Sequence, residues 1–206
     1  MFISFEGIDF SGKSTQCQLL KSFLSDRGQD VLLLREPGGT LISEKIRNIL
    51  LDKNNEKMKA LTEFLLYSAS RAQLVEEVIK PALAKGQFVI CDRYADSSTA
   101  YQGHARGLGI DLVETVNRIA TRGITPDLTI VIDIEIAIAI ERLKRDGKSS
   151  DRIEAEGSFF FEQVRQGFLQ VAARHQDRFK VVNGADDIST VEQNIRKLVV
   201  EKFDLT

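Results

Sequence analysis

Residues 7–14 read Gly7-Ile8-Asp9-Phe10-Ser11-Gly12-Lys13-Ser14, and they give the strongest indication of the fold. It fits the phosphate-loop (P-loop) pattern, which is a glycine, four residues and then Gly-Lys-Ser. Such a loop turns successive backbone N–H groups inward, where they bind phosphate oxygens, and its glycines adopt backbone angles closed to other residues. Lys13 is placed to reach the β- and γ-phosphates, and the Ser14 hydroxyl to ligate Mg²⁺.

The segments on both sides of the loop support this prediction. The stretch Phe2-Ile3-Ser4-Phe5 before the loop is short, apolar and rich in strand-forming residues. After the loop, Cys17, Leu20, Phe23 and Leu24 fall on one face of a helix, whose N-terminus favours an anion. The sequence therefore predicts a site for a nucleoside triphosphate, and the alternative is a glycine-rich turn that matches the pattern by chance.

Composition excludes several classes of protein. The chain has 206 residues, of which 43% are hydrophobic and 28% charged, and this predicts one globular domain with a full core. The net charge of −2 argues against a non-specific nucleic-acid binder, which would usually be basic. No apolar run reaches membrane-spanning length, and the two cysteines favour a reducing compartment. We therefore expect a cytoplasmic protein that binds neither nucleic acid nor membrane.

Strand-like and helix-like segments alternate along the chain. The expected strands are nearly continuous apolar runs, at Phe2–Phe5, Val31–Leu34, Phe88–Cys91, Leu128–Asp133 and Phe179–Val182. Such runs are typical of a parallel sheet covered by helices on both faces. We predict one α/β domain over residues 1–206 around a five-stranded parallel sheet, with ligands at the carboxyl ends of the strands.

A long helical pattern runs from about residue 60 to residue 85. Its buried stripe is predicted to consist of Leu61, Leu65, Ala69, Ala72, Val75 and Ile79, and Pro81 is predicted to kink or restart the helix. Tyr67 and Arg71 lie four residues apart and project from one face. Taken alone, this pair favours a core aromatic beside a surface arginine over a binding role.

Polar residues follow two of the strands at the carboxyl edge. After the second strand comes Arg35-Glu36-Pro37-Gly38-Gly39-Thr40, for which a binding role and a simple turn both stay open. The third strand ends in Asp92-Arg93-Tyr94, and Ser97, Tyr101 and Gln102 follow. The planar fork of Arg93 suits two phosphate oxygens, and the alternative is an ion pair with Asp92.

Residues 141–154 carry five basic and four acidic side chains, with glycine and serine between them. The segment is either a solvated charged loop or a mobile lid whose arginines Arg142, Arg145 and Arg152 reach the transferring phosphates. A lid would exclude water and so protect the phosphoryl donor from hydrolysis. Together with Arg93, it points to a phosphotransferase whose acceptor is itself a phosphate, in which positioned charges and Mg²⁺ carry the catalysis.

These motifs together resemble the bacterial thymidylate kinases. The resemblance covers nearly the whole chain and rests on the P-loop, on Tyr67 with Arg71, and on the stretches Arg35-Glu36-Pro37-Gly38-Gly39-Thr40, Asp92-Arg93-Tyr94, Tyr101-Gln102-Gly103 and Asp151-Arg152-Ile153-Glu154. It implies a P-loop kinase fold with a lid at about residues 141–154, a homodimer, and transfer of the ATP γ-phosphoryl group to dTMP for dTTP synthesis.

The resemblance also implies roles for individual residues. ATP would be bound by Gly7, Ile8, Asp9, Phe10, Ser11, Gly12, Lys13, Ser14 and Thr15, and Mg²⁺ by Ser14 and Asp9. The dTMP would be bound by Asp9, Glu36, Tyr67, Arg71, Arg93, Ser97, Tyr101 and Gln102. Catalysis would involve Asp9, Lys13, Arg93 and the lid arginines Arg142, Arg145 and Arg152, which the sequence does not rank.

Within this set, Tyr67 would stack on thymine, Arg71 would donate to its O4 atom, and Arg93 would hold the dTMP phosphate. The chain departs from the family pattern at Phe10, where some relatives have an arginine, and at Phe168, where many have a tyrosine. A kinase for another monophosphate, such as dUMP or dGMP, and a nucleotide-binding module without transfer are the alternatives.

Overall fold

The computed structural model describes residues 1–146 and 151–205. Its centre is a five-stranded sheet in the spatial order β2-β3-β1-β4-β5, in which every neighbouring pair is parallel. The strands are β1 (Phe2–Glu6), β2 (Val31–Arg35), β3 (Phe88–Asp92), β4 (Leu128–Asp133) and β5 (Phe179–Asn183). The predicted parallel sheet and all its strands are confirmed, and four of them extend one residue further towards the carboxyl edge.

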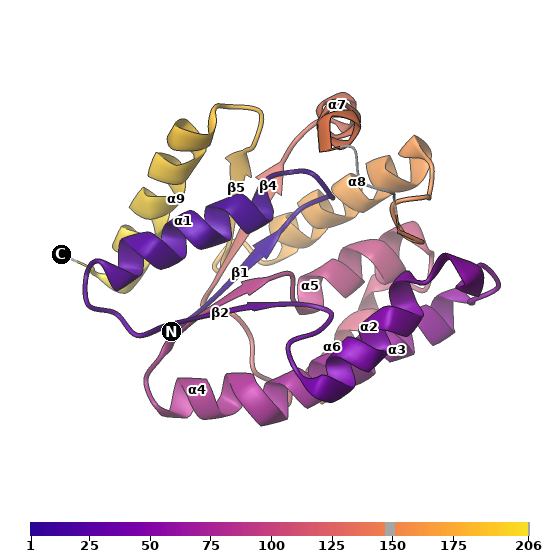
Figure 1. Cartoon of the computed structure of the whole chain (residues 1–206), viewed down its shortest axis with the longest axis horizontal. Coiled ribbons are helices and arrows are strands. Elements are labelled where there is room, and N and C mark those ends of the chain that lie inside the picture. The colour runs from indigo at the N-terminus through magenta and orange to yellow at the C-terminus, as the bar shows by residue number, and fades with distance from the viewer. Residues whose placement is uncertain (147–150, 206) are drawn as a thin grey trace.

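Helices cover both faces of this sheet (Figure 1). They are α1 (Lys13–Ser25), α2 (Leu41–Leu51), α3 (Ala60–Leu74), α4 (Lys80–Ala84), α5 (Ala95–Ser98), α6 (Ile110–Ala120), α7 (Ile136–Asp146), α8 (Ser158–Arg174) and α9 (Ile188–Phe203), together with η1 (Lys53–Asn55) and the π-helical turns η2 (Val75–Ile79) and η3 (Thr99–Ala105). In the part of the chain that the structure describes, no helix combines the length and apolarity needed to cross a membrane.

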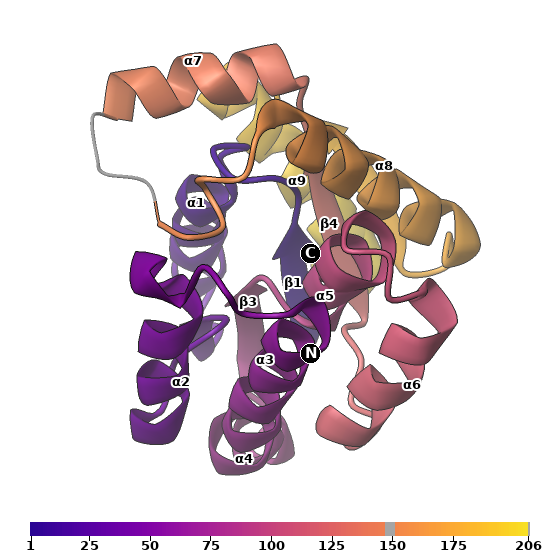
Figure 2. The ribbon, with the colours of Figure 1, turned by 90° about the vertical axis from the view of Figure 1, so that its right-hand side faces the viewer.

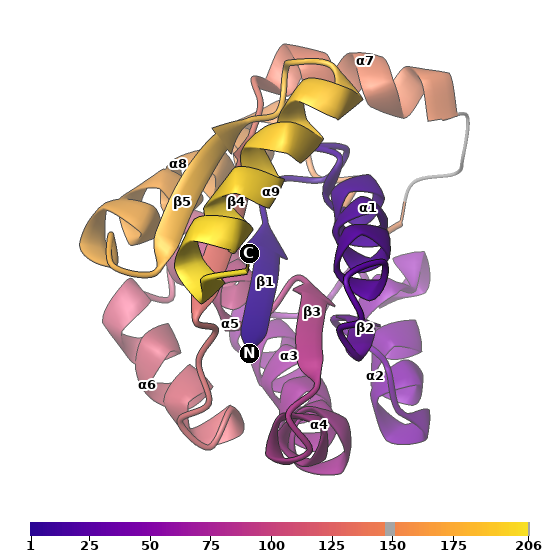
Figure 3. The same ribbon diagram turned by 90° about the vertical axis from the view of Figure 1, so that its left-hand side faces the viewer.

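The alternation of side chains along β1 separates two cores. Ile3 and Phe5 point to the face covered by α1 and α9, which lie side by side in Figure 3, and pack with Leu20 and Ile195. The opposite face is covered by the α3–α4 region and by α8 (Figure 2). Phe2 packs there with apolar side chains of η2 and α4. The sheet is thus buried on both sides, as continuous apolar strands require.

The strand order brings three loops together at one edge. Phe5 of β1 lies opposite Asp92 of β3, and Asp92 lies opposite Arg35 of β2. Because all three strands are parallel, the segments that follow them leave from the same edge of the sheet. The P-loop, Glu36 and Arg93 therefore meet there, although they are far apart in the sequence.

The turn from β1 into the P-loop admits only glycine at its first position. Gly7 has a φ of +134°, and a Cβ atom there would lie 2.4 Å from the carbonyl oxygen of Ile132 in β4. An L-residue would be strained by this φ, and the clash is with backbone that cannot move aside. The glycine that opens the sequence motif is thus required by the close approach of two strands.

The predicted buried stripe of the 60–85 helix is wrong in its first half. Leu61 and Leu65 are 51% and 49% exposed, whereas Glu63 and Arg71 are each 1% exposed. The inner face of α3 borders a polar cavity, so its charged residues turn inward and its leucines outward. The stripe is correct at Val75 and Ile79, which are buried in η2. The expected irregularity is confirmed as well, because η2 precedes Pro81 in the first turn of α4.

Candidate active site

The P-loop holds its lysine under the anion site. Lys13 is 6% exposed, and its Nζ donates to the Ile8 carbonyl oxygen at 2.8 Å and to Ser11 Oγ at 3.4 Å. Burial, helped by the nearby Arg93 guanidinium, lowers the pKa of Lys13 to about 8. An anion bound in the loop would supply the negative charge that favours the protonated lysine.

Ser14 and Asp92 supply oxygen atoms beside the loop. The Ser14 hydroxyl donates to Asp92 Oδ2, and both residues line a cavity of about 1340 Å³ together with residues 9–16. Hydroxyl and carboxylate oxygens are ligands that Mg²⁺ prefers, so this pair fits the predicted metal site. Asp92 is absent from the ligand set predicted from the sequence, and its place at the carboxyl end of β3 is the signal that could have included it.

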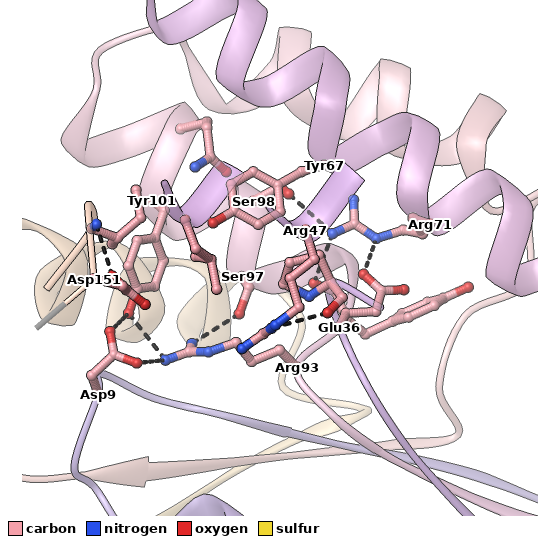
Figure 4. Close-up of a pocket in the computed structure, with 15 residues that line it drawn as sticks. Asp9, Glu36, Arg47, Tyr67, Arg71, Arg93, Ser97, Ser98, Tyr101 and Asp151 are labelled. Atoms are coloured by element: carbon pink, nitrogen blue, oxygen red, sulfur yellow. Dashed lines mark hydrogen bonds and ion pairs between the residues drawn. The ribbon is translucent and has the colours of Figure 1, made fainter. Parts of the chain in front are cut away.

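Arg93 lies at the centre of the site (Figure 4). Its Nη1 donates to the Gly7 carbonyl oxygen and to Ser97 Oγ, at 2.9 and 3.1 Å. Its Nη2 donates to Asp9 Oδ1 at 2.8 Å and to the Tyr101 hydroxyl at 3.2 Å, and this hydroxyl donates to Asp9 Oδ2 at 2.9 Å. The alternative considered for Arg93, an ion pair with Asp92, is not the pair that forms, because Arg93 pairs with Asp9 of the P-loop.

The same contacts set the charge of Asp9. Burial alone would raise the pKa of its carboxyl group, but the Arg93 guanidinium and the Lys13 ammonium outweigh burial and hold the pKa below its usual value. Asp9 was predicted as a metal ligand, and its two carboxylate oxygens bond to Arg93 and Tyr101. The structure therefore places Asp9 as the partner that orients Arg93.

A second, smaller cavity of about 100 Å³ adjoins the first. Its lining includes predicted acceptor residues, which are Asp9, Glu36, Tyr67, Arg71, Arg93, Ser97, Tyr101 and Gln102. The two cavities share five lining residues, Asp9, Glu36, Arg47, Arg93 and Asp151. Two ligands that fill them would therefore meet beside Arg93 and Asp9.

Arg71 is held rigidly at the far end of the smaller cavity. Its guanidinium makes four hydrogen bonds, to Glu36 Oε2 at 2.7 Å, Asn117 Oδ1 at 2.9 Å, Ser98 Oγ at 3.1 Å and the Tyr94 carbonyl oxygen at 3.2 Å. Burial raises the pKa of Glu36 to about 7, against the opposing charge of Arg71. The interpretation of Arg71 as a surface residue, which the local sequence favoured, is wrong, because its side chain is buried at the cavity.

Arg47 and Asp151 line both cavities, and the sequence assigned neither of them a binding or catalytic role. Arg47 of α2 donates to the Pro37 carbonyl oxygen at 3.0 Å and lines both cavities. The Asp151 carboxylate accepts the backbone N–H groups of Ile153 and Glu154, both at 2.8 Å. The helical pattern of residues 41–51 indicated the helix from its apolar residues, and only the tertiary structure shows that Arg47 faces the site.

The three lid arginines have different environments. Arg142 donates to the carbonyl oxygens of Phe10 and Ser11 at 3.1 Å and of Gly184 at 2.8 Å, so it supports the P-loop. Arg145 is 75% exposed, pairs with Glu141 and lines the larger cavity. Arg152 binds the Leu50 carbonyl oxygen and Glu63, each at 2.7 Å.

Arg152 is absent from the lining of both the larger and the smaller cavity. Residues 147–150 of the predicted lid lie outside the described residues, and residues 141–146 form the end of α7. Phe168 is buried, with its ring centroid 6.0 Å from that of Tyr101.

Comparison with known proteins agrees with this geometry. A family model described as thymidylate kinase matches residues 5–195. A thymidylate kinase of Caldanaerobacter subterraneus subsp. tengcongensis is 52% identical over 97% of this chain and 95% of its own length. One of Thermosipho melanesiensis is 50% identical over 99% and 100%.

A solved structure gives the same result for the fold. The crystal structure of thymidylate kinase from Ehrlichia chaffeensis superposes with a TM-score of 0.78 at 34% identity, covering 97% of this chain and 98% of that one. The predicted P-loop kinase fold is therefore confirmed. Both the match of the family model and the identities over nearly the full length show that this chain belongs to the thymidylate kinase family.

Proposed function

We propose that this chain, as one P-loop kinase domain, transfers the γ-phosphoryl group of ATP to dTMP and forms dTDP and ADP, a step in dTTP synthesis. One observation carries the proposal: the P-loop cavity and the smaller cavity share Arg93 and Asp9 in their lining. A donor and an acceptor phosphate in the two cavities would meet there, as in-line transfer requires.

ATP would fill the larger cavity. The backbone N–H groups of residues 7–15 would bind its phosphates, and Lys13 would reach the β- and γ-phosphates. Ser14 and Asp92 would hold Mg²⁺, which neutralises charge on the phosphates during transfer. Arg142, through its bonds to the carbonyl oxygens of Phe10 and Ser11, would keep the loop in shape.

The dTMP would fill the smaller cavity. Arg93 would bind its phosphate, and Tyr67 would stack on the thymine ring. The N–H group of Arg71 that is left over from its four hydrogen bonds would donate to O4 of the base. Tyr101, fixed by Asp9, would pack against the sugar.

Arg145 is our choice for the lid arginine that acts in transfer. It lines the P-loop cavity, and among the described residues it forms an ion pair only with the exposed Glu141, on the same helix. Exposed pairs of this kind contribute little free energy, so Arg145 can leave Glu141 for a phosphate at little cost. Arg142 and Arg152 are occupied by backbone carbonyls and by Glu63.

We also propose that the protein is a cytoplasmic homodimer. The helices α2, α3 and α6 pack in a row and expose large apolar side chains, which are Leu41, Ile42, Ile49, Leu61, Leu65, Leu112 and Ile119. An apolar surface over three adjacent helices is typical of an interface. Cys17 and Cys91 are buried free thiols, which agrees with a reducing compartment.

A coupled assay of ADP release tests the activity. We expect ATP turnover to be fastest with dTMP in a panel that also contains dUMP, dCMP and dGMP, and to be slow without an acceptor because water is a poor substitute for a bound phosphate. Faster turnover with another monophosphate would assign a different acceptor. Binding of ATP without ADP release for any monophosphate would favour a non-catalytic module.

A further inference from the structure

Glu63 of α3 is a buried carboxylate that the proposed mechanism does not use. It is 1% exposed, and its Oε1 accepts a hydrogen bond from Gln102 Nε2 at 2.9 Å. Its Oε2 accepts from Arg106 Nη2 at 3.2 Å and lies 2.7 Å from Arg152 Nη2. In Figure 2 the segment that begins at residue 151 passes the end of α2 before it enters α8. Arg152 contacts Leu50 of α2 there and so lies close to Glu63.

The charge of Glu63 determines the orientation of the Gln102 amide. Two guanidinium groups, of Arg106 and Arg152, lie against its carboxylate, and an ionised carboxylate only accepts hydrogen bonds. Of the two ends of the Gln102 amide, only the NH₂ group can face it. The carbonyl oxygen Oε1 must then face the other way, and within residues 1–146 and 151–205 no hydrogen-bond donor is paired with it.

Gln102 lines the smaller cavity together with Tyr67 and Arg71. Arg71 presents a donor there, and Gln102 presents an acceptor. Thymine carries the matching groups on neighbouring atoms, with a carbonyl acceptor at O4 and a donor at N3–H. Cytosine carries an amino donor at position 4 and an acceptor at N3, so both contacts would be mismatched and the buried polar groups left unpaired.

We propose that Glu63 is a specificity-determining positioning residue, which selects thymine over cytosine by holding the Gln102 amide with its carbonyl oxygen towards N3–H. This inference rests on the proposed function, since it assumes that dTMP occupies the smaller cavity. Glu63 does not touch the nucleotide itself and acts through Gln102. Arg106 and Arg152 pair with its carboxylate, so Arg152 has a role away from the phosphates.

Glu63→Gln tests the proposal because it keeps size and shape but allows the facing amide to adopt either orientation. We expect the ratio of kcat/KM for dTMP to that for dCMP to fall about tenfold or more, the equivalent of one lost hydrogen bond to a buried group. The change should lie in KM for the monophosphate, while KM for ATP stays the same. An unchanged ratio in a folded Glu63→Gln protein would overturn the proposal.

A matched control and a rescue variant separate this role from a structural one. Glu156→Gln removes another carboxylate that pairs with Arg106, at 2.7 Å, but does not contact Gln102, so it should leave the ratio unchanged. The double variant Glu63→Gln with Gln102→Glu places an obligatory acceptor at position 102 and should restore the ratio. If Glu63→Gln alone does not fold, the double variant decides: a ratio as low as that of Gln102→Ala contradicts the proposal.

The activity of the parent protein distinguishes failure of the proposed function from failure of the proposed role of Glu63. If the parent does not phosphorylate dTMP, the proposed function fails. If the parent prefers dTMP and Glu63→Gln, with normal folding, keeps the same preference, only the role of Glu63 fails.

Discussion

Among the single residues, Arg93 is the one on which the proposed transfer depends most. Its guanidinium lies between the two cavities and is oriented by Asp9, Gly7, Ser97 and Tyr101. In Arg93→Ala we expect kcat/KM for dTMP to fall by about 10³, because a preorganised charge at the acceptor phosphate is lost. ATP binding, measured by calorimetry, should change by less than about threefold, since the P-loop supplies its own donors.

Arg174→Ala is the control for this prediction. Arg174 is an exposed arginine paired with the exposed Asp111, and its removal should leave both measurements unaltered. Near-parental catalytic efficiency of Arg93→Ala would show that another group binds the acceptor phosphate.

Arg71 has two proposed roles. It recognises the base, and it stabilises the fold because it pairs with the buried carboxylate of Glu36. In Arg71→Met we expect the free energy of unfolding to fall by about 3–5 kcal/mol, since Glu36 stays buried without its partner. Adding Glu36→Gln should recover most of this loss, and urea unfolding measures both effects. In the double variant the preference for dTMP over dCMP should still be weakened by about 1–3 kcal/mol, the cost of a lost hydrogen bond to a charged group.

Two outcomes would contradict this account of Arg71. Equal stability losses for the single and double variants would show that the Glu36 charge is not the cause. An unchanged ratio of kcat/KM for dTMP and dCMP would remove Arg71 from base recognition.

Among the secondary structure elements, the β1–α1 turn depends most strictly on one residue type. Gly7→Ala combines a strained φ with a clash against the Ile132 carbonyl oxygen, and we expect a loss of about 3 kcal/mol or more in the free energy of unfolding. ATP affinity should fall by about a hundredfold, because the first turn of the loop must open. Gly28→Ala is the matched control, with a φ of +75° and no atom within 4 Å of the added Cβ.

Gly28→Ala should lower the free energy of unfolding by only about 1–2 kcal/mol and leave ATP affinity unchanged. Equal losses of ATP affinity in Gly7→Ala and Gly28→Ala would mean that the close contact between the P-loop and β4 does not contribute to ATP binding.

At the scale of the whole molecule, the exposed apolar side chains of α2, α3 and α6 predict a homodimer. Leu65→Glu with Ile119→Glu should convert a dimer into a monomer, because glutamates would be buried without partners in the interface. Sedimentation or light scattering measures the mass. Phe159→Glu changes a more exposed side chain on α8 and should leave the dimer intact. A parent that is monomeric at micromolar concentration would contradict the proposed assembly.

Buried carboxyl groups give the fold a pH dependence. Burial, with the neighbouring Asp96, raises the pKa of Glu6 from 4.5 to about 8. Between these values the folded protein keeps a proton that the unfolded chain loses, so the free energy of unfolding falls as pH rises. For one proton the slope is about 1.4 kcal/mol per pH unit.

Glu6→Gln should lose this contribution, so its stability should decline less steeply than that of the parent from about pH 5 to about pH 8. Urea unfolding at several pH values measures the difference. The exposed Glu201→Gln is the control and should keep the parental slope. Parallel pH profiles for parent and Glu6→Gln would show that Glu6 is ionised throughout.

Local sequence was enough to predict the P-loop, the five strands and the carboxyl edge as the ligand site. Each of these depends on neighbouring residues: a glycine pattern that shapes a loop, or an apolar run that must be buried on both faces. Family resemblance added the acceptor residues, and the structure brings these residues together around the smaller cavity.

Long-range packing determines which side of α3 faces inward and what each arginine contacts. Helical periodicity predicted Leu61 and Leu65 as core, but the inner face borders a polar cavity and is held by Arg71 and Glu63. Arg142, Arg145 and Arg152 look equivalent in the sequence and differ in their partners, which come from distant segments of the chain. Short-range patterns determine the elements, whereas burial and pairing of charge depend on long-range contacts that no local pattern contains.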